Sequence, residues 1–116
     1  MAPQLDSLTE FDVTTGLEHA DNDEELYLEV LAMFHDQLQN EFQGLPEHLG
    51  QPDDTIARKV HTLKGSASSV GASRIALAAT DIDQTLKRGD PVDTAQSEAL
   101  RDAIQAGLKQ LSSVIQ

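Results

Sequence analysis

His61, Lys64 and Gly65 are the residues of this sequence whose types and spacing most clearly favour chemistry. At helical spacing they share one face with Arg58 and Ser68. A neutral imidazole has an available ring nitrogen and can act as a nucleophile near pH 7, and Lys64 can neutralise an anion placed there. Because a glycine inside a helix costs about 1 kcal/mol relative to alanine, we infer that Gly65 leaves room for a partner. Together these features favour acceptance of a phosphoryl group.

The element that must position these residues is a helix that residues 52–54 open and Gly71 ends. Asp53 or Asp54 can cap its first turn, and Gly71 suits the left-handed conformation that follows many helices. The apolar stripe of this helix consists of Ile56, Val60, Leu63, Ala67 and Val70. Since this stripe faces away from His61, burying it leaves the histidine on an open surface.

Three further segments have helical apolar periodicity. One opens with residues 21–25, four of which are acidic, one is capped by Ser73 and ends at 87–89, and one follows a turn at 90–91. Their stripes are Tyr27, Val30, Leu31, Phe34, Leu38 and Phe42; Ile75, Ala78, Ala79, Ile82 and Leu86; and Leu100, Ile104, Leu108, Leu111 and Ile115. Asp12 is expected to cap a short preceding helix. We therefore predict an all-α fold, an antiparallel four-helix bundle with a short additional N-terminal helix.

Length and composition agree with one small helical domain. The 116 residues suit a single domain over 1–116, and 39% hydrophobic residues with only 3% aromatics favour helices. Residues 1–9 lack periodicity, so we expect a loosely ordered arm there. Without cysteine the chain cannot form disulfides, thiolate nucleophiles or cysteine zinc sites.

Charge and hydropathy narrow the range of partners. The net charge of −12 disfavours nucleic acid and anionic membranes. No apolar run is long enough to span a bilayer and no signal segment opens the chain, so we expect a cytoplasmic protein without membrane insertion. A monomer is the expected state, and a complete small protein is the expected form of the chain.

Enzyme chemistry finds little support in the sequence. Carboxylate-bridged metal bundles use Glu-x-x-His pairs, but the residues three positions before the histidines are Gly16, Ala32, Leu45 and Arg58. No glycine-rich phosphate loop follows a strand, and the serines at 66, 68 and 69 lack a strand-turn-helix elbow. A metal-dependent or hydrolytic helical enzyme is therefore the disfavoured alternative. We expect His19 and His48 to be solvated and His35 to lie at the margin of the core.

Residues 61–67 (HTLKGSA), followed by Val70-Gly71-Ala72, resemble the signature of histidine-containing phosphotransfer (HPt) domains of bacterial phosphorelays and two-component systems. The similarity covers roughly residues 8–90, and the last helix matches only as an amphipathic pattern. The further matching positions are Phe11, Asp12, Gly16, Leu17, residues 23–27, Phe34, Ala76, Ala79, Ile82, Asp83 and Leu86. The resemblance implies a four-helix bundle with an exposed histidine on its second long helix.

The resemblance also implies roles for individual residues. His61 would accept the phosphoryl group through Nε2, Lys64 would stabilise it, and Gly65 would give clearance to the receiver domain. In relatives a Glu or Gln often hydrogen-bonds the other ring nitrogen and fixes the tautomer. The matching residue here is Asp83, whose shorter side chain leaves Gln84 as the alternative.

As a function, the resemblance implies a phosphorelay intermediate without kinase activity or a nucleotide site. It would take a phosphoryl group from the aspartate of one receiver domain and pass it to another. The partners would be response-regulator receivers or a hybrid sensor histidine kinase. No cofactor or metal is expected on this chain, because the magnesium ion belongs to the receiver. A pseudo-HPt adaptor that binds a kinase or receiver without being phosphorylated is the alternative. We also expect Lys87, one turn beyond Asp83, either to add positive charge near the phosphate or to serve the C-terminus of its helix.

Overall fold

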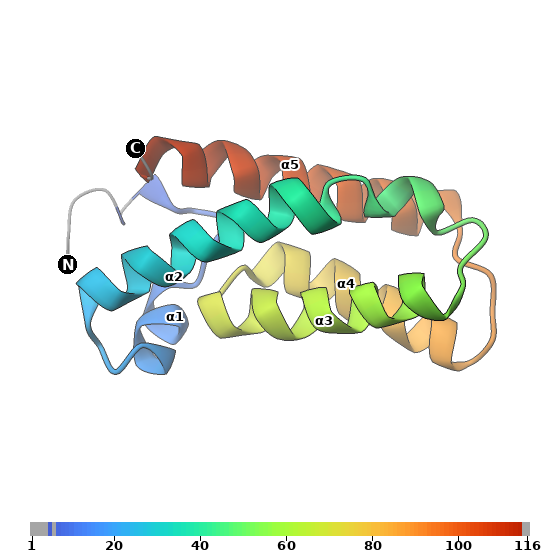
Figure 1. The fold of residues 1–116 in the computed structure, drawn as a ribbon, viewed down its shortest axis with the longest axis horizontal. Helices are drawn as coiled ribbons and strands as arrows, with labels where there is room; N and C mark the ends of the chain where they lie inside the picture. Colours follow the sequence, from blue (N-terminus) through green and yellow to red (C-terminus); the bar gives the residue numbers. More distant parts are fainter. Residues whose placement is uncertain (1–4, 6, 115–116) are drawn as a thin grey trace.

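The computed structural model describes residue 5 and residues 7–114, and this part of the chain forms an all-helical bundle (Figure 1). Four long helices, α2 to α5, alternate in direction along the longest dimension of a body of 42 × 23 × 20 Å. The helices are α1 (Val13–His19), α2 (Glu24–Gln37), a π-helical turn (Leu38–Phe42), a 3-10 turn (Leu45–His48), α3 (Asp54–Val70), α4 (Ser73–Lys87) and α5 (Thr94–Val114). The predicted fold class is confirmed.

Aspartates begin four of the helices. The side chains of Asp12, Asp23, Asp53 and Asp93 accept backbone hydrogen bonds from the residue three positions further on, at 3.1, 3.1, 2.9 and 2.8 Å. Each aspartate thereby satisfies a backbone N–H that has no partner within its helix. The expected cap at Asp12 and the expected helix start in residues 21–25 are confirmed, and of the two candidates for α3 the structure selects Asp53.

The predicted cap of α4 at Ser73 is wrong. The chain leaves the left-handed Gly71 through Ala72, which occupies the N-cap position and makes no side-chain cap. Ser73 already lies inside the first turn, and its hydroxyl donates backwards to the Gly71 carbonyl oxygen at 3.2 Å. The start of α4 is therefore set by the preceding tight turn and not by a polar side chain.

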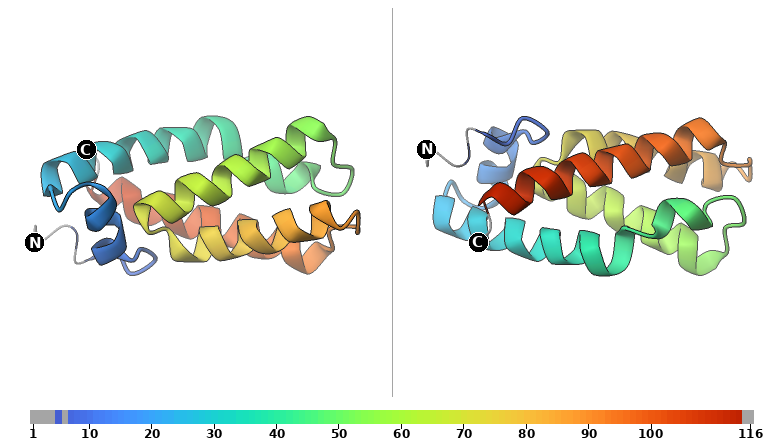
Figure 2. Two further views of the ribbon diagram at one scale, coloured as in Figure 1. Left: turned by 90° about the horizontal axis from the view of Figure 1, so that it is seen from below. Right: turned by 90° about the horizontal axis from the view of Figure 1, so that it is seen from above.

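The C-terminal end of α3 is held by the N-terminal part of the chain. Gly71 has a φ of 78° and ends the helix as predicted. Its carbonyl oxygen accepts from the Asp12 N–H at 2.6 Å, and the Val70 carbonyl oxygen accepts from the buried Tyr27 hydroxyl at 2.7 Å. Carbonyls at the end of α3 thereby receive partners, so the N-cap residue of α1 and a side chain of α2 hold this end of α3 in place (Figure 2).

The predicted apolar stripes meet in one core. Buried members include Tyr27, Leu31, Phe34, Leu38, Phe42, Val60, Leu63, Ala67, Val70, Ile75, Ala79, Ile82, Leu100, Ile104 and Leu111. Val30, Ala78 and Leu108 are half-buried against it, and the predicted contact of Ile115 lies outside the described residues. Within this part of the chain no helix is long and apolar enough to cross a membrane.

The N-terminal segment departs from its expected loose order. Residues 1–4 and 6 lie outside the described residues, but Leu5 and Leu8 are buried in the core. Just beyond them, the Glu10 N–H donates to the Gln110 side chain at 2.9 Å, and the amide group of Gln110 donates to the Thr9 hydroxyl. Two leucines three residues apart are too few to show periodicity in the sequence, yet they bury enough apolar surface to hold the segment.

Three of the four histidines take structural or surface positions. His48 is exposed, as expected. His19 is exposed, but its Nδ1 also lies 2.9 Å from the Ser69 carbonyl oxygen at the end of α3. His35 is half-buried between α2 and α5, with Nε2 3.3 Å from the Ser112 hydroxyl. Unlike these three histidines, His61 lies on the outer surface of α3.

Candidate functional site

His61 lies near the middle of α3 and presents its side chain to solvent. Val60 and Leu63 anchor the helix in the core on either side of it, and both are completely buried. Because an α-helix turns by about 100° per residue, the next position, 61, points out of the core. The side chain of His61 retains 61% of its accessible surface, so the imidazole is open to a reaction partner.

Asp83 is the buried counterpart of His61 on the neighbouring helix. The α3–α4 hairpin around Gly71 brings the two helices side by side (Figure 2). Oδ1 of Asp83 lies 3.5 Å from Nδ1 of His61, whereas the Asp83 side chain is only 6% exposed. This separation is longer than the roughly 2.7–3.2 Å of an ordinary N–H···O hydrogen bond. Asp83 therefore faces the Nδ1 side of the ring at ion-pair distance.

The second oxygen of Asp83 binds two ammonium groups. Nζ of Lys64 donates to Oδ2 at 3.0 Å, and Nζ of Lys87 lies 2.9 Å from the same atom. Lys64 comes from α3, one turn after His61, and Lys87 comes from α4, one turn after Asp83. One buried carboxylate therefore gathers an imidazole and two cations from two helices.

The ionisation of Asp83 follows from this arrangement. Burial by itself raises the pKa of the carboxyl group, because it removes water from the charged form. Hydrogen bonds from Lys87 and Lys64, together with their positive charges, act in the opposite direction and prevail. The pKa of Asp83 therefore lies below its ordinary value, and the carboxylate is charged at neutral pH.

Of the two candidates for contact with His61, the structure selects Asp83. Gln84 is exposed on the outer side of α4, whereas Asp83 points between the helices. The shorter side chain of aspartate still reaches the site because α3 and α4 pack closely. The paired lysines on one carboxylate were not expected, although the spacing of Asp83 and Lys87 is the i, i+4 spacing of helical ion pairs.

Gly65 leaves open space one turn after His61. A Cβ atom built at this position would meet no atom of the surrounding chain within 4 Å. Packing within this protein therefore does not require a glycine here, in contrast to Gly16, where the same atom would overlap the ring of Tyr27. The missing side chain keeps the surface beside the imidazole flat.

Two hollows flank the exposed side of α3. One, of about 330 Å³, lies between α3 and α4 and is lined by Ala57, Arg58, His61, Asp83, Leu86 and Lys87. The other, of about 150 Å³, lies between α2 and α3 and is lined by Val30, Met33, Phe34, Gln37, Ser66, Ser69 and Val70. Met33 at its edge is 62% exposed. His61 is thus bordered by a cationic hollow on the α4 side, and the surface of α3 continues to an apolar hollow on the α2 side.

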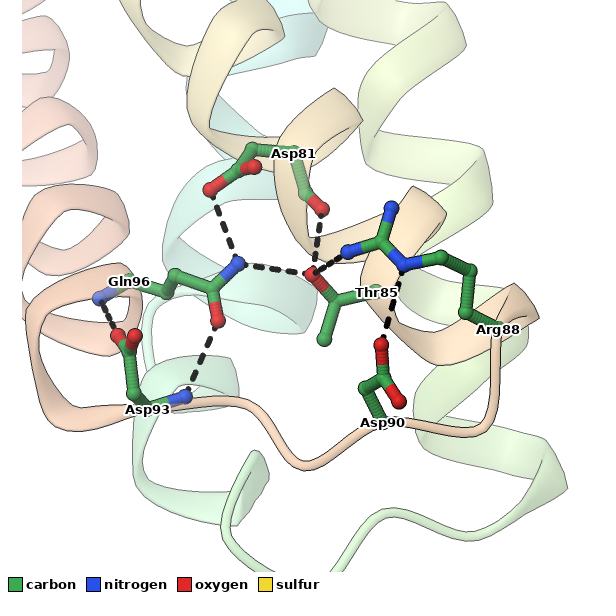
Figure 3. A network of polar contacts seen from close by, with 6 residues as sticks. All are labelled: Asp81, Thr85, Arg88, Asp90, Asp93 and Gln96. Atoms are coloured by element: carbon green, nitrogen blue, oxygen red, sulfur yellow. Dashed lines mark hydrogen bonds and ion pairs between the residues drawn. The ribbon is translucent and has the colours of Figure 1, made fainter.

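A polar network fixes the end of α4 that carries Lys87 (Figure 3). The buried Thr85 hydroxyl donates to the Asp81 carbonyl oxygen at 3.1 Å and accepts from Gln96 and Arg88 at 2.9 and 3.3 Å. Gln96 belongs to α5 and also donates to the Asp81 carboxylate at 2.9 Å. Thr85 was not among the residues predicted from the sequence, because it lies off the apolar stripe of α4. Its effect is to hold the last turns of α4 against α5.

Among residue 5 and residues 7–114, no group of three or more His, Cys, Asp or Glu side chains is arranged to hold a metal ion. His61 is close to one carboxylate and two ammonium groups, a set of charges that suits an anion better than a cation. The expectation that this chain needs no metal or cofactor stays a prediction.

Fold and site together define a small helical-bundle protein whose distinctive chemical group is a surface histidine backed by a buried carboxylate. The sequence model of the Hpt domain matches residues 29–113, and the chain therefore belongs to the Hpt domain family. Hpt domains are phosphotransfer modules of phosphorelays, not kinases, and in general they interact with receiver domains and kinases. Searches of curated proteins and of solved structures found no significant match.

Proposed function

We propose that this protein is a phosphorelay intermediate in which His61 accepts a phosphoryl group from a receiver-domain aspartate and passes it to another receiver. The observation that carries the proposal is the pairing of a largely exposed imidazole with a buried carboxylate at its Nδ1. Such a pairing favours the tautomer with the proton on Nδ1 and leaves the lone pair on Nε2 facing outward. Membership of the Hpt domain family supports it independently.

In the proposed transfer, the Nε2 lone pair of His61 attacks the phosphorus atom of the receiver's acyl phosphate. An N–P bond forms, the P–O bond to the aspartate breaks, and the electron pair leaves with the aspartate carboxylate. The ring keeps its Nδ1 proton and becomes positively charged. The Asp83 carboxylate at 3.5 Å opposes that charge. Onward transfer is the same step in reverse, with the carboxylate of the second receiver as the nucleophile.

Lys64 and Lys87 are placed to stabilise the transferred group. Both ammonium groups sit on Oδ2 of Asp83 in the unmodified chain. A phosphoryl group on Nε2 adds a stronger anion nearby, toward which either lysine can turn without leaving its helix position. We expect magnesium to remain on the receiver and no cofactor to bind this chain.

Docking of the receiver is proposed over His61, with apolar residues around it forming the contact. Gly65 gives the clearance, and the hollow between α2 and α3 offers apolar surface that includes the exposed Met33. The alternative is a pseudo-HPt adaptor, which would use the same surface to bind a kinase or receiver without being phosphorylated.

Incubation with a receiver domain carrying labelled phosphate tests the proposal. The wild-type chain should take up label as an acid-labile, base-stable phosphate, the stability that a phosphohistidine shows. His61→Ala should take up none and keep its thermal unfolding midpoint, because the side chain is largely exposed. His48→Ala, a second exposed histidine, serves as the matched control and should behave like the wild type. Label on His61→Ala would refute the assignment, and binding of the receiver without any label would favour the adaptor.

A further inference from the structure

Arg58 is a cation in the hollow that is also lined by His61. It lies one helical turn before the histidine, is exposed, and lines the hollow of about 330 Å³ between α3 and α4. Within the part of the chain that the structure describes, its side chain makes no hydrogen bond or ion pair. The other arginines are each paired with a carboxylate: Arg74 with Glu10, Arg88 with Asp90 and Arg101 with Glu47.

The cations closest to His61 differ from Arg58 in this respect. Lys64 and Lys87 both bind Oδ2 of Asp83, at 3.0 and 2.9 Å. A new anion must compete with Asp83 for either of them. The guanidinium of Arg58 can receive an anion without losing an existing partner, so it is available at first contact.

We propose that Arg58 is a docking residue, whose guanidinium binds a carboxylate on the surface of the receiver beside its phosphorylated aspartate. This inference rests on the proposed function. A guanidinium presents a planar fork of donors that matches a carboxylate in a bidentate pair. The chain carries a net charge of −12, so an acidic partner is repelled over most of its surface. The cationic border of this hollow is where such a partner is attracted and oriented.

The geometry of the hollow separates docking from transfer. Lys64 and Lys87 meet at Asp83, directly behind His61, whereas Arg58 stands one turn away along α3. The aliphatic side chains of Ala57 and Leu86 form part of its lining, and closure of the interface over them removes water and strengthens an ion pair. Arg58 therefore governs binding of the receiver, while the lysines act on the phosphoryl group.

The test measures single-turnover transfer from a phosphorylated receiver over a range of receiver concentrations. The probe is the purified receiver domain, from the same organism, that phosphorylates the wild-type chain fastest. For Arg58→Gln we expect the half-saturating concentration to rise about tenfold and the rate at saturation to stay within twofold of the wild type. Arg58→Lys keeps the positive charge but loses the planar fork of donors. Its half-saturating concentration should therefore lie between those of the wild type and Arg58→Gln.

Lys59→Gln is the matched control. Lys59 neighbours Arg58 in the sequence and also lacks an ion pair in the described part of the chain, but it lines a different hollow with Asn40 and Glu41. Its replacement changes the net charge equally and should leave half-saturation within twofold of the wild type. If both variants raise the half-saturating concentration equally, the effect comes from total charge and the proposal is overturned.

Binding of the unphosphorylated receiver supplies the second arm. A receiver carboxylate is present with or without the phosphoryl group. In calorimetric titrations, Arg58→Gln should therefore lower the affinity for both forms of the receiver to a similar degree. Weakening confined to the phosphorylated receiver would place Arg58 on the phosphoryl group and overturn the inference, as would a lower rate at saturation. Failure of the proposed function looks different, because then the wild-type chain itself takes up no label.

Discussion

Oδ1 of Asp83 lies 3.5 Å from Nδ1 of His61, while the exposed fractions of the two side chains differ tenfold, 6% against 61%. The residue proposed to react is open to solvent, and the residue proposed to orient it is buried between α3 and α4. A buried carboxylate moves little, because its neighbours restrict its rotamers. This division gives an exposed imidazole a defined orientation without enclosing it.

Replacement of Asp83 tests this orienting role. Asp83→Asn keeps the shape but removes the charge that opposes a positive ring and binds both lysines. We expect single-turnover transfer at saturating receiver to fall about tenfold, equivalent to about 1.4 kcal/mol in the barrier. NMR of the ring nitrogens should show a smaller fraction of the Nδ1–H tautomer of His61. Asp102→Asn, an exposed carboxylate on α5, is the charge control; an unchanged tautomer and rate in Asp83→Asn would remove Asp83 from the mechanism.

The loss of folding stability at acid pH depends on the same carboxylate. The pKa of Asp83 in the folded chain lies below its ordinary value of 3.8, so the unfolded chain binds its proton first as the pH falls. The stabilisation is complete above pH 3.8 and is lost progressively as the pH drops through the folded pKa. Urea unfolding between pH 2 and 6 should therefore show a shallower acid decline for Asp83→Asn than for Asp102→Asn. Equal slopes would mean that the lysines do not hold the carboxylate in solution.

Removal of the two lysines should have unequal and non-additive effects on transfer. Lys64 is 28% exposed and follows His61 on the same helix, whereas Lys87 is 62% exposed. We expect Lys64→Gln to slow transfer at saturating receiver more than Lys87→Gln. Because both bind one oxygen atom, loss of one lets the other bind Asp83 more tightly, so a double-mutant cycle should give a coupling of about 0.5 kcal/mol or more. Strict additivity would contradict the shared contact.

Replacing Gly65 should increase the stability of the protein but slow phosphoryl transfer. Since an added Cβ meets no atom within 4 Å, Gly65→Ala should raise the free energy of unfolding by up to about 1 kcal/mol through helix propensity. Transfer from the receiver should nevertheless slow, and Gly65→Leu should slow it further, because each side chain occupies the space reserved for the partner. Thermal unfolding and transfer assays measure the two effects. A variant that is more stable and transfers at the wild-type rate would show that no close approach occurs there.

Ionisation of Tyr27 should make the folding stability fall at alkaline pH. Burial, with a smaller contribution from the negative charge of Asp12, raises the pKa of its hydroxyl from 10.0 to about 12. The folded chain therefore keeps the proton that the unfolded chain releases first. The stabilisation is complete below pH 10 and is lost as the pH rises toward 12. Tyr27→Phe should flatten this decline and, by losing the hydrogen bond to the Val70 carbonyl oxygen, reduce stability at neutral pH by about 1 kcal/mol.

Local signals predicted most of the helical framework correctly. Asp12 and Gly71 act within a few residues of themselves, and the apolar stripes follow a 3.6-residue period, so neither depends on distant parts of the chain. The error at Ser73 was local, because the tight turn at Gly71 placed this residue inside the first turn of α4. The error in the N-terminal segment had a longer-range cause, because the bundle buried Leu5 and Leu8 although the sequence around them shows no pattern.

Residue types and their spacing within individual helices were sufficient to predict the all-helical class, the exposed position of His61 and the family resemblance. Which side chain faces Nδ1 depends instead on the packing of one helix against another, since the choice between Asp83 and Gln84 follows from how α4 lies against α3. The same packing placed both lysines on one oxygen and, among the described residues, gave the Arg58 side chain no ion-pair partner. Contacts between helices are set by their relative rotation and separation, which no periodicity within one helix specifies.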